Sequence, residues 1–240
     1  MSKFARYGGV MKLGLASDLQ DEFQNIEGLW NIFKDVVDQW LVVDSGSTDN
    51  TPWKLQHIVG DKLVLIHNDM VKTKGYSYAR TKLIELSEGM DWVLIIDGDE
   101  RMLLEEALKV RKLIDTDPPY DLIWIPRVSN WCWDRQMANY GGVNFGIGPN
   151  RRQALEHEPD WQPRLIRRTM IKDRSFVQFY RPVHELIQGL GGIPIRELRS
   201  LDNPVLDSFG RLKNPERKKM INDLCKDIWK RLGDGSDIQI

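Results

Sequence analysis

The order of apolar segments in the first part of the chain predicts an α/β fold, a mostly parallel sheet with helices on both faces. Short apolar runs of strand composition alternate with longer amphipathic runs, and the connections between them are short. The run WLVVD at 40–44 has no polar residue until its end, as expected of a strand that is buried on both faces. Strands and helices that alternate in this way form parallel sheets.

Each element of this half has its own signal. The run at 23–37 spaces Ile26, Leu29 and Phe33 at helical intervals. The segment SGSTDNTP is a turn rich in helix-capping residues. From such signals we expect strands at 11–16, 40–44, 62–68 and 91–97, and helices at 23–37, 53–59 and 76–89.

The pattern changes after the fourth expected strand. We expect a helix at 103–115, a strand at 121–128, short strands within 161–168 and 175–188, and a charged helix at 214–235. The Gly-, Asn- and Trp-rich stretch between the strands, 129–150, has no clear period, which is typical of a functional loop. The whole chain, 1–240, is expected to form a single domain.

Composition excludes several classes of protein. The chain is 41% hydrophobic and 29% charged, which argues against disorder, and no apolar run is long enough for a membrane helix. Its two cysteines, Cys132 and Cys225, are too few for a disulfide framework, and the N-terminus lacks the features of a signal peptide. We therefore expect a cytoplasmic protein without a membrane span.

The net charge of −1 hides an asymmetry between the two parts of the chain. Residues 1–150 carry 16 Lys and Arg against 22 Asp and Glu, and residues 151–240 carry 18 against 13, giving −6 and +5. Excess charge on a helical tail is usually explained by solvation, so nucleic-acid binding is not indicated.

Carboxylates follow two of the buried strands. Asp44 ends one strand, and Asp97, Gly98 and Asp99 follow another. Ligands of parallel α/β sheets bind beyond the carboxyl ends of the strands, so these side chains are expected to open into one crevice. Mn²⁺ or Mg²⁺ held by carboxylates and phosphate oxygens is the partner that fits them. The alternative is that the acidic residues cap the helix that begins near Leu103.

Several motifs together resemble family 2 glycosyltransferases of the Rossmann-like GT-A fold. They are, in order, DEFQNIE, VVDSGSTDNTP, YSYAR, DWVLIIDGDER, WQPRLIRR and PVHE. The third and the last two resemble the lipopolysaccharide glucosyltransferase-like branch. In the first motif Asp21 replaces the family's Asn, whereas Glu22 is retained. The resemblance covers about residues 11–190, and the last fifty residues have no counterpart.

The resemblance implies roles for individual residues. The implied donor-binding residues are Ala16, Glu22, Asp44, Arg80, Asp97, Gly98 and Asp99. Asp44 would bind the nucleobase, Arg80 would lie near the ribose or pyrophosphate, and Asp99 would hold the metal together with His184. Three of these have simpler alternatives: Asp44 could cap the helix after the turn, Arg80 could pair with Glu85 on a helix surface, and His184 could be a structural histidine.

The resemblance also divides the chain and implies a reaction. Residues 10–120 would bind the nucleotide-sugar, 121–200 would face the acceptor with its loops, and 201–240 would be a C-terminal helical extension. The implied enzyme is a metal-dependent, inverting glycosyltransferase that moves a hexose from a UDP-sugar to a hydroxyl. The base would be Glu185 or, as second candidate, Asp160.

Two other functions remain open at this point. One is a non-catalytic module that binds nucleotide-sugars or glycans. The other is metal-dependent phosphoryl transfer of the haloacid dehalogenase type, which Arg101 and Met102 fit badly. The acceptor is not determined, and a modified nucleic-acid base is among the hydroxyl compounds that remain open.

Overall fold

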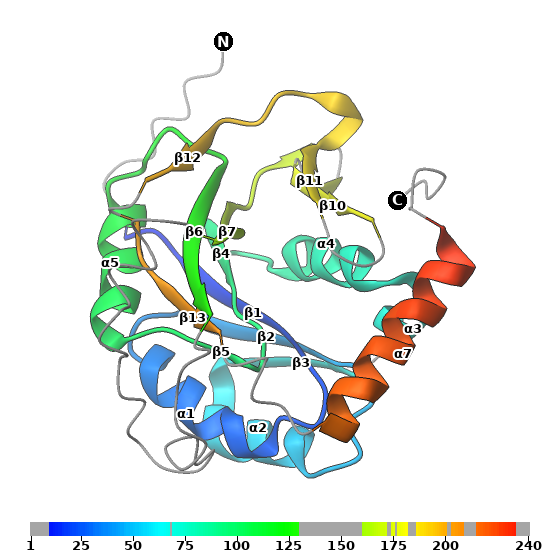
Figure 1. The fold of residues 1–240 in the computed structure, drawn as a ribbon. Coiled ribbons are helices and arrows are strands. Elements are labelled where there is room, and N and C mark those ends of the chain that lie inside the picture. Colours follow the sequence, from blue (N-terminus) through cyan, green and yellow to red (C-terminus); the bar gives the residue numbers. More distant parts are fainter. Residues whose placement is uncertain are drawn as a thin grey trace.

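The computed structural model describes residues 10–67, 69–129, 160–171, 174–175, 177–181, 186–200, 203–208 and 215–233. Within these residues, nine strands join in one sheet, and two further pairs of strands form small ribbons. Figure 1 shows helices on both faces of the sheet and α7 along one side of the molecule. No helix in the described ranges is long and apolar enough to cross a membrane.

The parallel part of the sheet contains the four strands expected from the sequence. They are β1 (Leu13–Leu19), β2 (Gln39–Asp44), β3 (Leu63–His67) and β4 (Trp92–Ile95). Their order is β3-β2-β1-β4, and every pair among them is parallel. The predicted α/β class with a mostly parallel sheet is therefore confirmed.

The second part of the sheet is mixed. β7 (Asp160–Arg167) lies antiparallel between β4 and β6 (Leu122–Ser129). Beyond β6 come β12 (Glu197–Arg199), β13 (Leu206–Ser208) and β5 (Glu100–Arg101). The insertion of β7 matters for the site, because it brings residues of the second half beside the end of β4.

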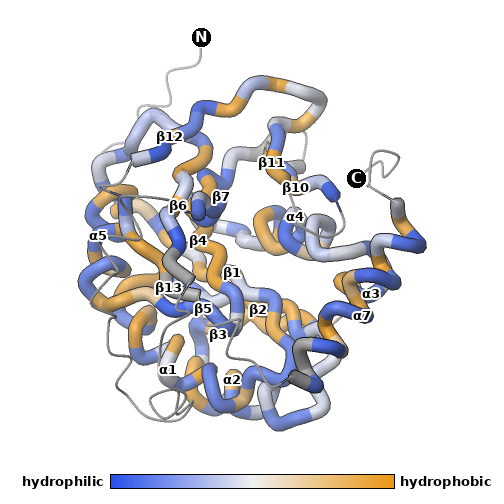
Figure 2. Tube along the Cα trace, in the orientation of Figure 1, coloured by the Kyte–Doolittle hydropathy of each residue, from blue (hydrophilic) through white to orange (hydrophobic). Residues whose placement is uncertain are grey.

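Strand alternation divides the core into two layers. One face of the sheet packs against α1 (Phe23–Phe33), α2 (Thr51–Val59) and α5 (Leu104–Asp115). The other face packs against α4 (Tyr76–Leu86) and the ribbon of β10 (Val177–Tyr180) and β11 (Leu186–Gly189). Figure 2 shows the hydrophobic central strands and the mixed colouring of the outer helices.

The smaller elements complete the fold. The short helix α3 (Met70–Lys74) was not expected from the sequence, whereas α7 (Pro215–Leu232) was, and the two pack together. The remaining elements are η1 (Gly60–Lys62), β8 (Met170–Ile171), β9 (Arg174–Ser175) and η2 (Leu190–Gly192). The expected helix at 23–37 ends at Phe33, because the chain turns there to enter β2.

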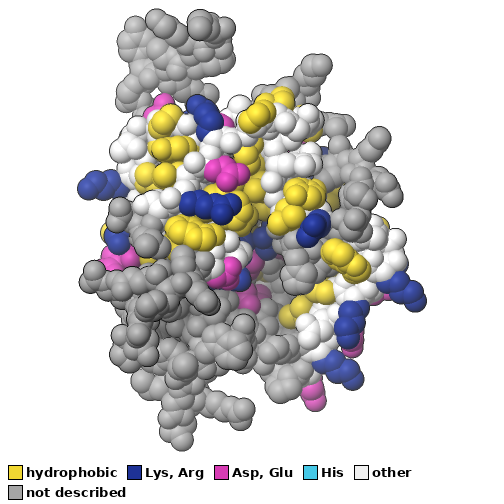
Figure 3. All heavy atoms as spheres, turned by 45° about the horizontal axis from the view of Figure 1, so that its top comes forward, with side chains coloured by type: hydrophobic (Ala, Val, Ile, Leu, Met, Phe, Trp, Pro, Cys, Tyr) yellow, Lys and Arg dark blue, Asp and Glu magenta, His cyan; other side chains and the backbone are white. Residues whose placement is uncertain are grey.

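The surface above β11 and β12 mixes apolar and basic side chains, as Figure 3 shows for this face of the molecule. On β6 and β12 the guanidinium of Arg199 stacks over the ring of Trp124 at 3.9 Å, and the Trp124 Nε1 donates to Glu197 at 3.0 Å. These contacts fasten the edge strand β12 to its neighbour.

Candidate active site

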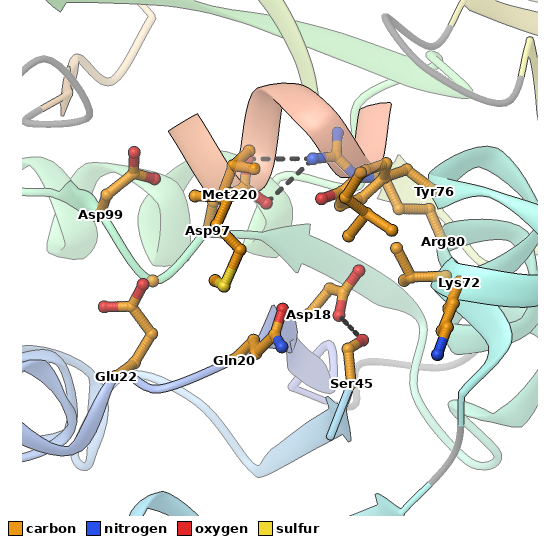
Figure 4. Close-up of a pocket in the computed structure, with 14 residues that line it drawn as sticks. Asp18, Gln20, Glu22, Ser45, Lys72, Tyr76, Arg80, Asp97, Asp99 and Met220 are labelled. Atoms are coloured by element: carbon orange, nitrogen blue, oxygen red, sulfur yellow. Dashed lines mark hydrogen bonds and ion pairs between the residues drawn. The ribbon is translucent and has the colours of Figure 1, made fainter. Parts of the chain in front are cut away.

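A cavity of about 360 Å³ lies beyond the carboxyl ends of β1, β2 and β4. Its floor is polar and comes from the end of β1 and from the chain that follows these strands. The floor residues are Asp18, Gln20, Glu22, Ser45, Asp97, Gly98 and Asp99. Figure 4 shows Asp99 and Glu22 at one end of the cavity and Ser45 and Lys72 at the other.

Strand alternation decides which acidic residues reach this cavity. Ala16, Val43 and Ile95 face the α4 layer, so Asp18, Ser45 and Asp97, each two residues later, continue on that face. Asp44 is one residue away from this pattern, so its side chain points to the opposite face of the sheet. Its side chain is fully buried and does not line the cavity.

Asp44 has a defined environment of its own. Its Oδ2 lies 2.8 Å from His67 Nδ1 and accepts a hydrogen bond from the Ser47 N–H at 3.3 Å. Its Oδ1 has no hydrogen-bond partner within the described part of the chain. The structure therefore separates Asp44 from Asp97, although the sequence suggested a shared crevice, and nucleobase binding by Asp44 stays a prediction.

Asp97 is surrounded by arginines. Arg80 Nη2 donates to both of its carboxylate oxygens at 2.9 Å, and Arg164 Nη2 donates to Oδ2 at 2.8 Å. Burial alone would raise the pKa of Asp97, but the charges of Arg164, Arg80 and Arg127 outweigh it and hold this pKa well below its usual value. Asp97 is therefore a permanently ionised hydrogen-bond acceptor on the cavity wall.

The alternative partner for Arg80 does not apply. Glu85 pairs with Lys82 at 2.5 Å, and Arg80 is directed to Asp97 instead. The resemblance placed Arg80 at the donor site, and the structure places it in the cavity wall, as Figure 4 shows.

Glu100 lies beneath the site. It is 1% exposed and accepts from Arg164 at 2.6 Å, from Arg127 at 3.3 Å and from the backbone N–H of Asp97 at 3.0 Å. Burial raises the pKa of Glu100; Arg164 opposes this rise, and the nearby charges of Asp97 and Asp99 add to it. The segment is thus fixed from below by a buried carboxyl.

The capping alternative for the acidic segment is wrong. α5 begins after Leu103, and no side chain forms a hydrogen bond that caps it. Glu100 and Arg101 instead form β5, which pairs with β13.

Gly98 is required by close contact with Glu22. A Cβ atom at Gly98 would lie 2.5 Å from Glu22 Cγ and 2.9 Å from Glu22 Oε1. The Glu22 carboxylate also accepts a short hydrogen bond from the Asn25 side chain. The absent side chain therefore lets Glu22 lie against the segment that carries Asp97 and Asp99.

Asp21, the departure from the family motif, organises the loop after β2. It adopts a positive φ of 52°, which Asp tolerates better than most residues. Its Oδ1 accepts from the N–H groups of Thr48 at 2.6 Å and Asp49 at 3.2 Å, and its own N–H donates to Ser47 Oγ at 2.9 Å. Asp21 thereby links the loop after β1 to the loop after β2.

Several cavity residues were missed by the sequence analysis. Asp18, whose Oδ1 accepts from Ser45 Oγ at 2.5 Å, could have been found by continuing the alternation of the first strand. Lys72 comes from α3, and no signal in the sequence marked it. Tyr76, at the start of α4, is the first residue of the YSYAR motif, in which only Arg80 was given a role.

The other predicted site residues lie elsewhere. Ala16 is fully buried in the core layer beneath α4. Asp160 begins β7 and pairs with Arg127, whose Nε and Nη2 lie 2.8 and 2.6 Å from its Oδ2; it does not line the cavity. His184 and Glu185 lie outside the described residues.

The carboxylates at the Asp99 end of the cavity suit a hard cation only if substrate phosphates complete its coordination. Within the described ranges, no group of three or more His, Cys, Asp or Glu could hold a metal ion. Asp97 is engaged by two arginines, and Asp99 and Glu22 are further carboxylates that line the cavity. Mg²⁺-type sites commonly use one or two carboxylates and complete the shell with substrate phosphates, so these residues fit such a cation.

Comparisons with solved structures find distant similarities. TarS of S. aureus, residues 1–349, is 18% identical with a TM-score of 0.49, covering 95% of this chain and 67% of that one. Glucosyl-3-phosphoglycerate synthase of Mycobacterium tuberculosis, in complex with Mn²⁺, UDP-glucose and phosphoglyceric acid, is 18% identical with a TM-score of 0.39. That match covers 51% of this chain and 45% of that one.

One curated relative is more similar in sequence. A TPR repeat-containing protein of Synechococcus elongatus is 27% identical over 178 residues, which are 74% of this chain. The chain spans 36% of the length of that relative.

One family model matches a range of the chain that contains most of the residues that line the cavity. This model, described as glycosyl transferase family 2, matches residues 22–182, more than half of the chain. The matched range begins at Glu22 and includes β2, β3 and β4, Arg80 and the segment from Asp97 to Asp99. Because the match covers more than half of the chain and includes these cavity residues, the chain belongs to glycosyl transferase family 2.

Proposed function

We propose that this protein transfers a sugar, most simply a hexose, from a UDP-sugar to an acceptor hydroxyl in a reaction that depends on Mn²⁺ or Mg²⁺. One observation carries the proposal: in a member of this family, Asp97, Gly98 and Asp99 follow a buried strand and line a cavity together with Glu22 and Arg80. The narrower resemblance to the lipopolysaccharide glucosyltransferase-like branch stays a prediction.

Different residues of the cavity would bind different parts of the nucleotide-sugar. Asp97 is kept ionised by Arg80 and Arg164, so it accepts hydrogen bonds from donor hydroxyl groups such as those of a ribose. Asp99 and Glu22 would hold the cation together with the donor phosphates. When bound, such a cation offsets the negative charge that develops on the departing diphosphate.

The nucleobase preference rests on the neighbourhood of Asp44. Its unpartnered Oδ1 is a hydrogen-bond acceptor whose desolvation has a cost unless a ligand donates to it. The imide N–H of uracil supplies such a donor, whereas adenine has no imide. This is the ground for choosing UDP as the nucleotide.

The residues proposed for the acceptor side are chosen by their position in the sequence, and Asp160, which the structure describes, does not line the cavity. In an inverting transfer a carboxylate takes the proton of the acceptor hydroxyl, and Glu185 is the first candidate with Asp160 as the second. Asp160 is held by Arg127, which would have to release it. His184 is proposed as the further metal ligand.

The direct test is release of UDP from a UDP-sugar with and without Mn²⁺. Asp99→Asn is expected to lower the Mn²⁺-dependent rate by about 100-fold or more, because it removes a charge that fixes the cation at the leaving group. Asp61→Asn, at an exposed position outside the cavity, is the matched control and should retain the wild-type rate. Equal rates for wild type and Asp99→Asn would refute the metal role. Tight UDP binding without any product would instead favour a non-catalytic binding module.

A further inference from the structure

The C-terminal helix α7 contributes to the cavity although it lies beyond the family match. Met220, Ile221 and Leu224 of α7 line the cavity opposite its polar floor. The match to the family ends at residue 182. The cavity is therefore completed by an element that the family resemblance does not explain.

The C-terminal half of α7 is firmly anchored. Ile228 is fully buried against Val71 of α3 and Ala79 of α4. Arg231 adds a hydrogen bond from its guanidinium to the backbone carbonyl of Lys72. This half of the helix consequently has a fixed place beside α3 and α4.

The N-terminal half has a different environment. Met220 is 46% exposed and is not part of the cluster around Ile228. It lies four residues before Leu224, so both side chains share one helix face. Figure 4 shows Met220 extending from α7 into the cavity between Asp97 and Gln20. Apolar groups thus face a polar floor across the cavity, and part of their surface stays exposed in the free protein.

The two ends of the cavity suggest what covers this apolar face. The carboxylates suited to a cation and phosphates, Asp99 and Glu22, lie at one end in Figure 4. Ser45 and Lys72 lie at the other end, with Met220 and Asp18 between. A nucleoside diphosphate whose phosphates occupy the Asp99 end would therefore extend its nucleoside beneath α7.

We propose that α7 forms the nucleoside-binding wall of the donor pocket, with Met220 packed on the nucleobase and ribose and with Ile221 and Leu224 extending the same surface. This inference rests on the proposed function. A thioether is polarizable and makes favourable contacts with aromatic rings, and an apolar wall suits any flat base. The wall thus contributes affinity, while the proposed discrimination between bases rests on Asp44, which precedes Ser45 of the floor in the chain.

The test compares a ligand that has a nucleoside with one that lacks it. Binding of UDP and of pyrophosphate, each with Mn²⁺, is measured by calorimetry for wild type and Met220→Ala. UDP affinity should fall by about 3- to 10-fold, the effect expected from loss of a sulfur–aromatic contact and its buried surface, whereas pyrophosphate affinity should stay the same. Met220→Leu, which keeps the apolar volume, should recover most of the UDP affinity.

Trp229→Ala is the matched control, since Trp229 is an exposed apolar residue of the same helix outside the cavity. It should leave both affinities unchanged. Equal UDP affinity in wild type and Met220→Ala would overturn the role of α7 while leaving the proposed function intact. Equal losses for UDP and pyrophosphate would also overturn it, because the effect would then not depend on the nucleoside. Failure of wild type to bind UDP at all would overturn the proposed function first.

Discussion

Gly98 has no side chain because the space where one would lie is occupied by Glu22. The contact explains why a glycine stands between two aspartates at the end of a buried strand. A carboxylate from the loop after β1 has to lie against the backbone of the segment after β4, and only an absent Cβ allows it. The aspartates and Glu22 thus depend on each other for their positions.

Gly98→Ala is therefore expected to damage the site more than the fold. Glu22 would have to move away, and Mn²⁺-dependent UDP affinity should fall by about 10-fold or more, as for other groups that orient a metal ligand. Titration calorimetry with UDP and Mn²⁺ measures the change.

Gly28→Ala is the matched control, because a Cβ at this position in α1 would meet nothing within 4 Å. Its affinity should equal that of wild type, and its stability should increase by up to about 1 kcal/mol, since alanine favours a helix over glycine. If Gly98→Ala also binds as wild type does, the contact with Glu22 has no part in the site.

At the scale of elements, β7 stabilises the site from the second half of the chain. Arg164 on β7 is 2% exposed in its side chain and donates to both Asp97 and Glu100. Since β7 lies between β4 and β6, this one arginine reaches both carboxylates and adds to the pairing of Asp97 with Arg80 and of Glu100 with Arg127.

Arg164→Met should cost about 3–5 kcal/mol of the free energy of unfolding, because it removes the main charged partner of the buried Glu100 and of Asp97. Urea denaturation measures it. Arg199→Met is the control on the edge strand β12, where the side chain is half exposed and its pair with Glu197 is 3.7 Å long, so the loss should be about 1 kcal/mol or less. Similar losses for both variants would contradict the special role of Arg164.

A second pair ties the start of β6 to the segment before β12. Asp121 is buried and accepts from Arg196 Nη2 at 2.7 Å, Nε at 2.9 Å and the backbone N–H at 3.0 Å. Burial would raise the pKa of Asp121, but the hydrogen bonds and charge of Arg196 lower it below 3.8. The stabilisation by its carboxylate is then fully present above that value and is lost as pH falls through the lower pKa of the folded state.

Asp121→Asn should therefore destabilise the protein by a constant amount between about pH 7 and pH 5, and by less below about pH 4. Chemical denaturation at several pH values tests the sign and the window. Asp117→Asn, at an exposed ion pair with Arg167, should show a small effect at every pH. A difference for Asp121→Asn that grows on acidification would show that the sign is wrong.

At the scale of the whole molecule, the cavity joins parts that are far apart in sequence. Its floor lies at the carboxyl ends of β1, β2 and β4, and its opposite side comes from α7, whose C-terminal half packs on α3 and α4. Ligand binding should consequently act on the two halves of α7 unequally.

Hydrogen exchange with UDP and Mn²⁺ should protect amides around Met220 to Leu224 more than those around Ile228 to Leu232, because the latter half is already packed in the free protein. The same experiment with pyrophosphate and Mn²⁺ should leave both halves as in the free protein. Uniform protection of α7 by UDP would argue against a nucleoside beneath its first turns.

The sequence by itself determined the α/β class, the four parallel strands and the family, and it singled out Arg80 and the Asp97 to Asp99 segment, which the structure brings to one cavity. These follow from local signals: apolar runs, helical spacing and motifs whose order is preserved along the chain. The prediction of a shared crevice for Asp44 and Asp97 was wrong, because it did not consider strand alternation. The two side chains face opposite sides of the sheet.

The tertiary structure alone decided that β7 inserts beside β4, that Arg164 rather than a cap satisfies the acidic segment, and that α7 closes the cavity. Each of these is a contact between residues more than 60 positions apart. Such contacts depend on sheet order and helix docking, which follow from the packing of the whole chain, and no short segment of the sequence encodes them.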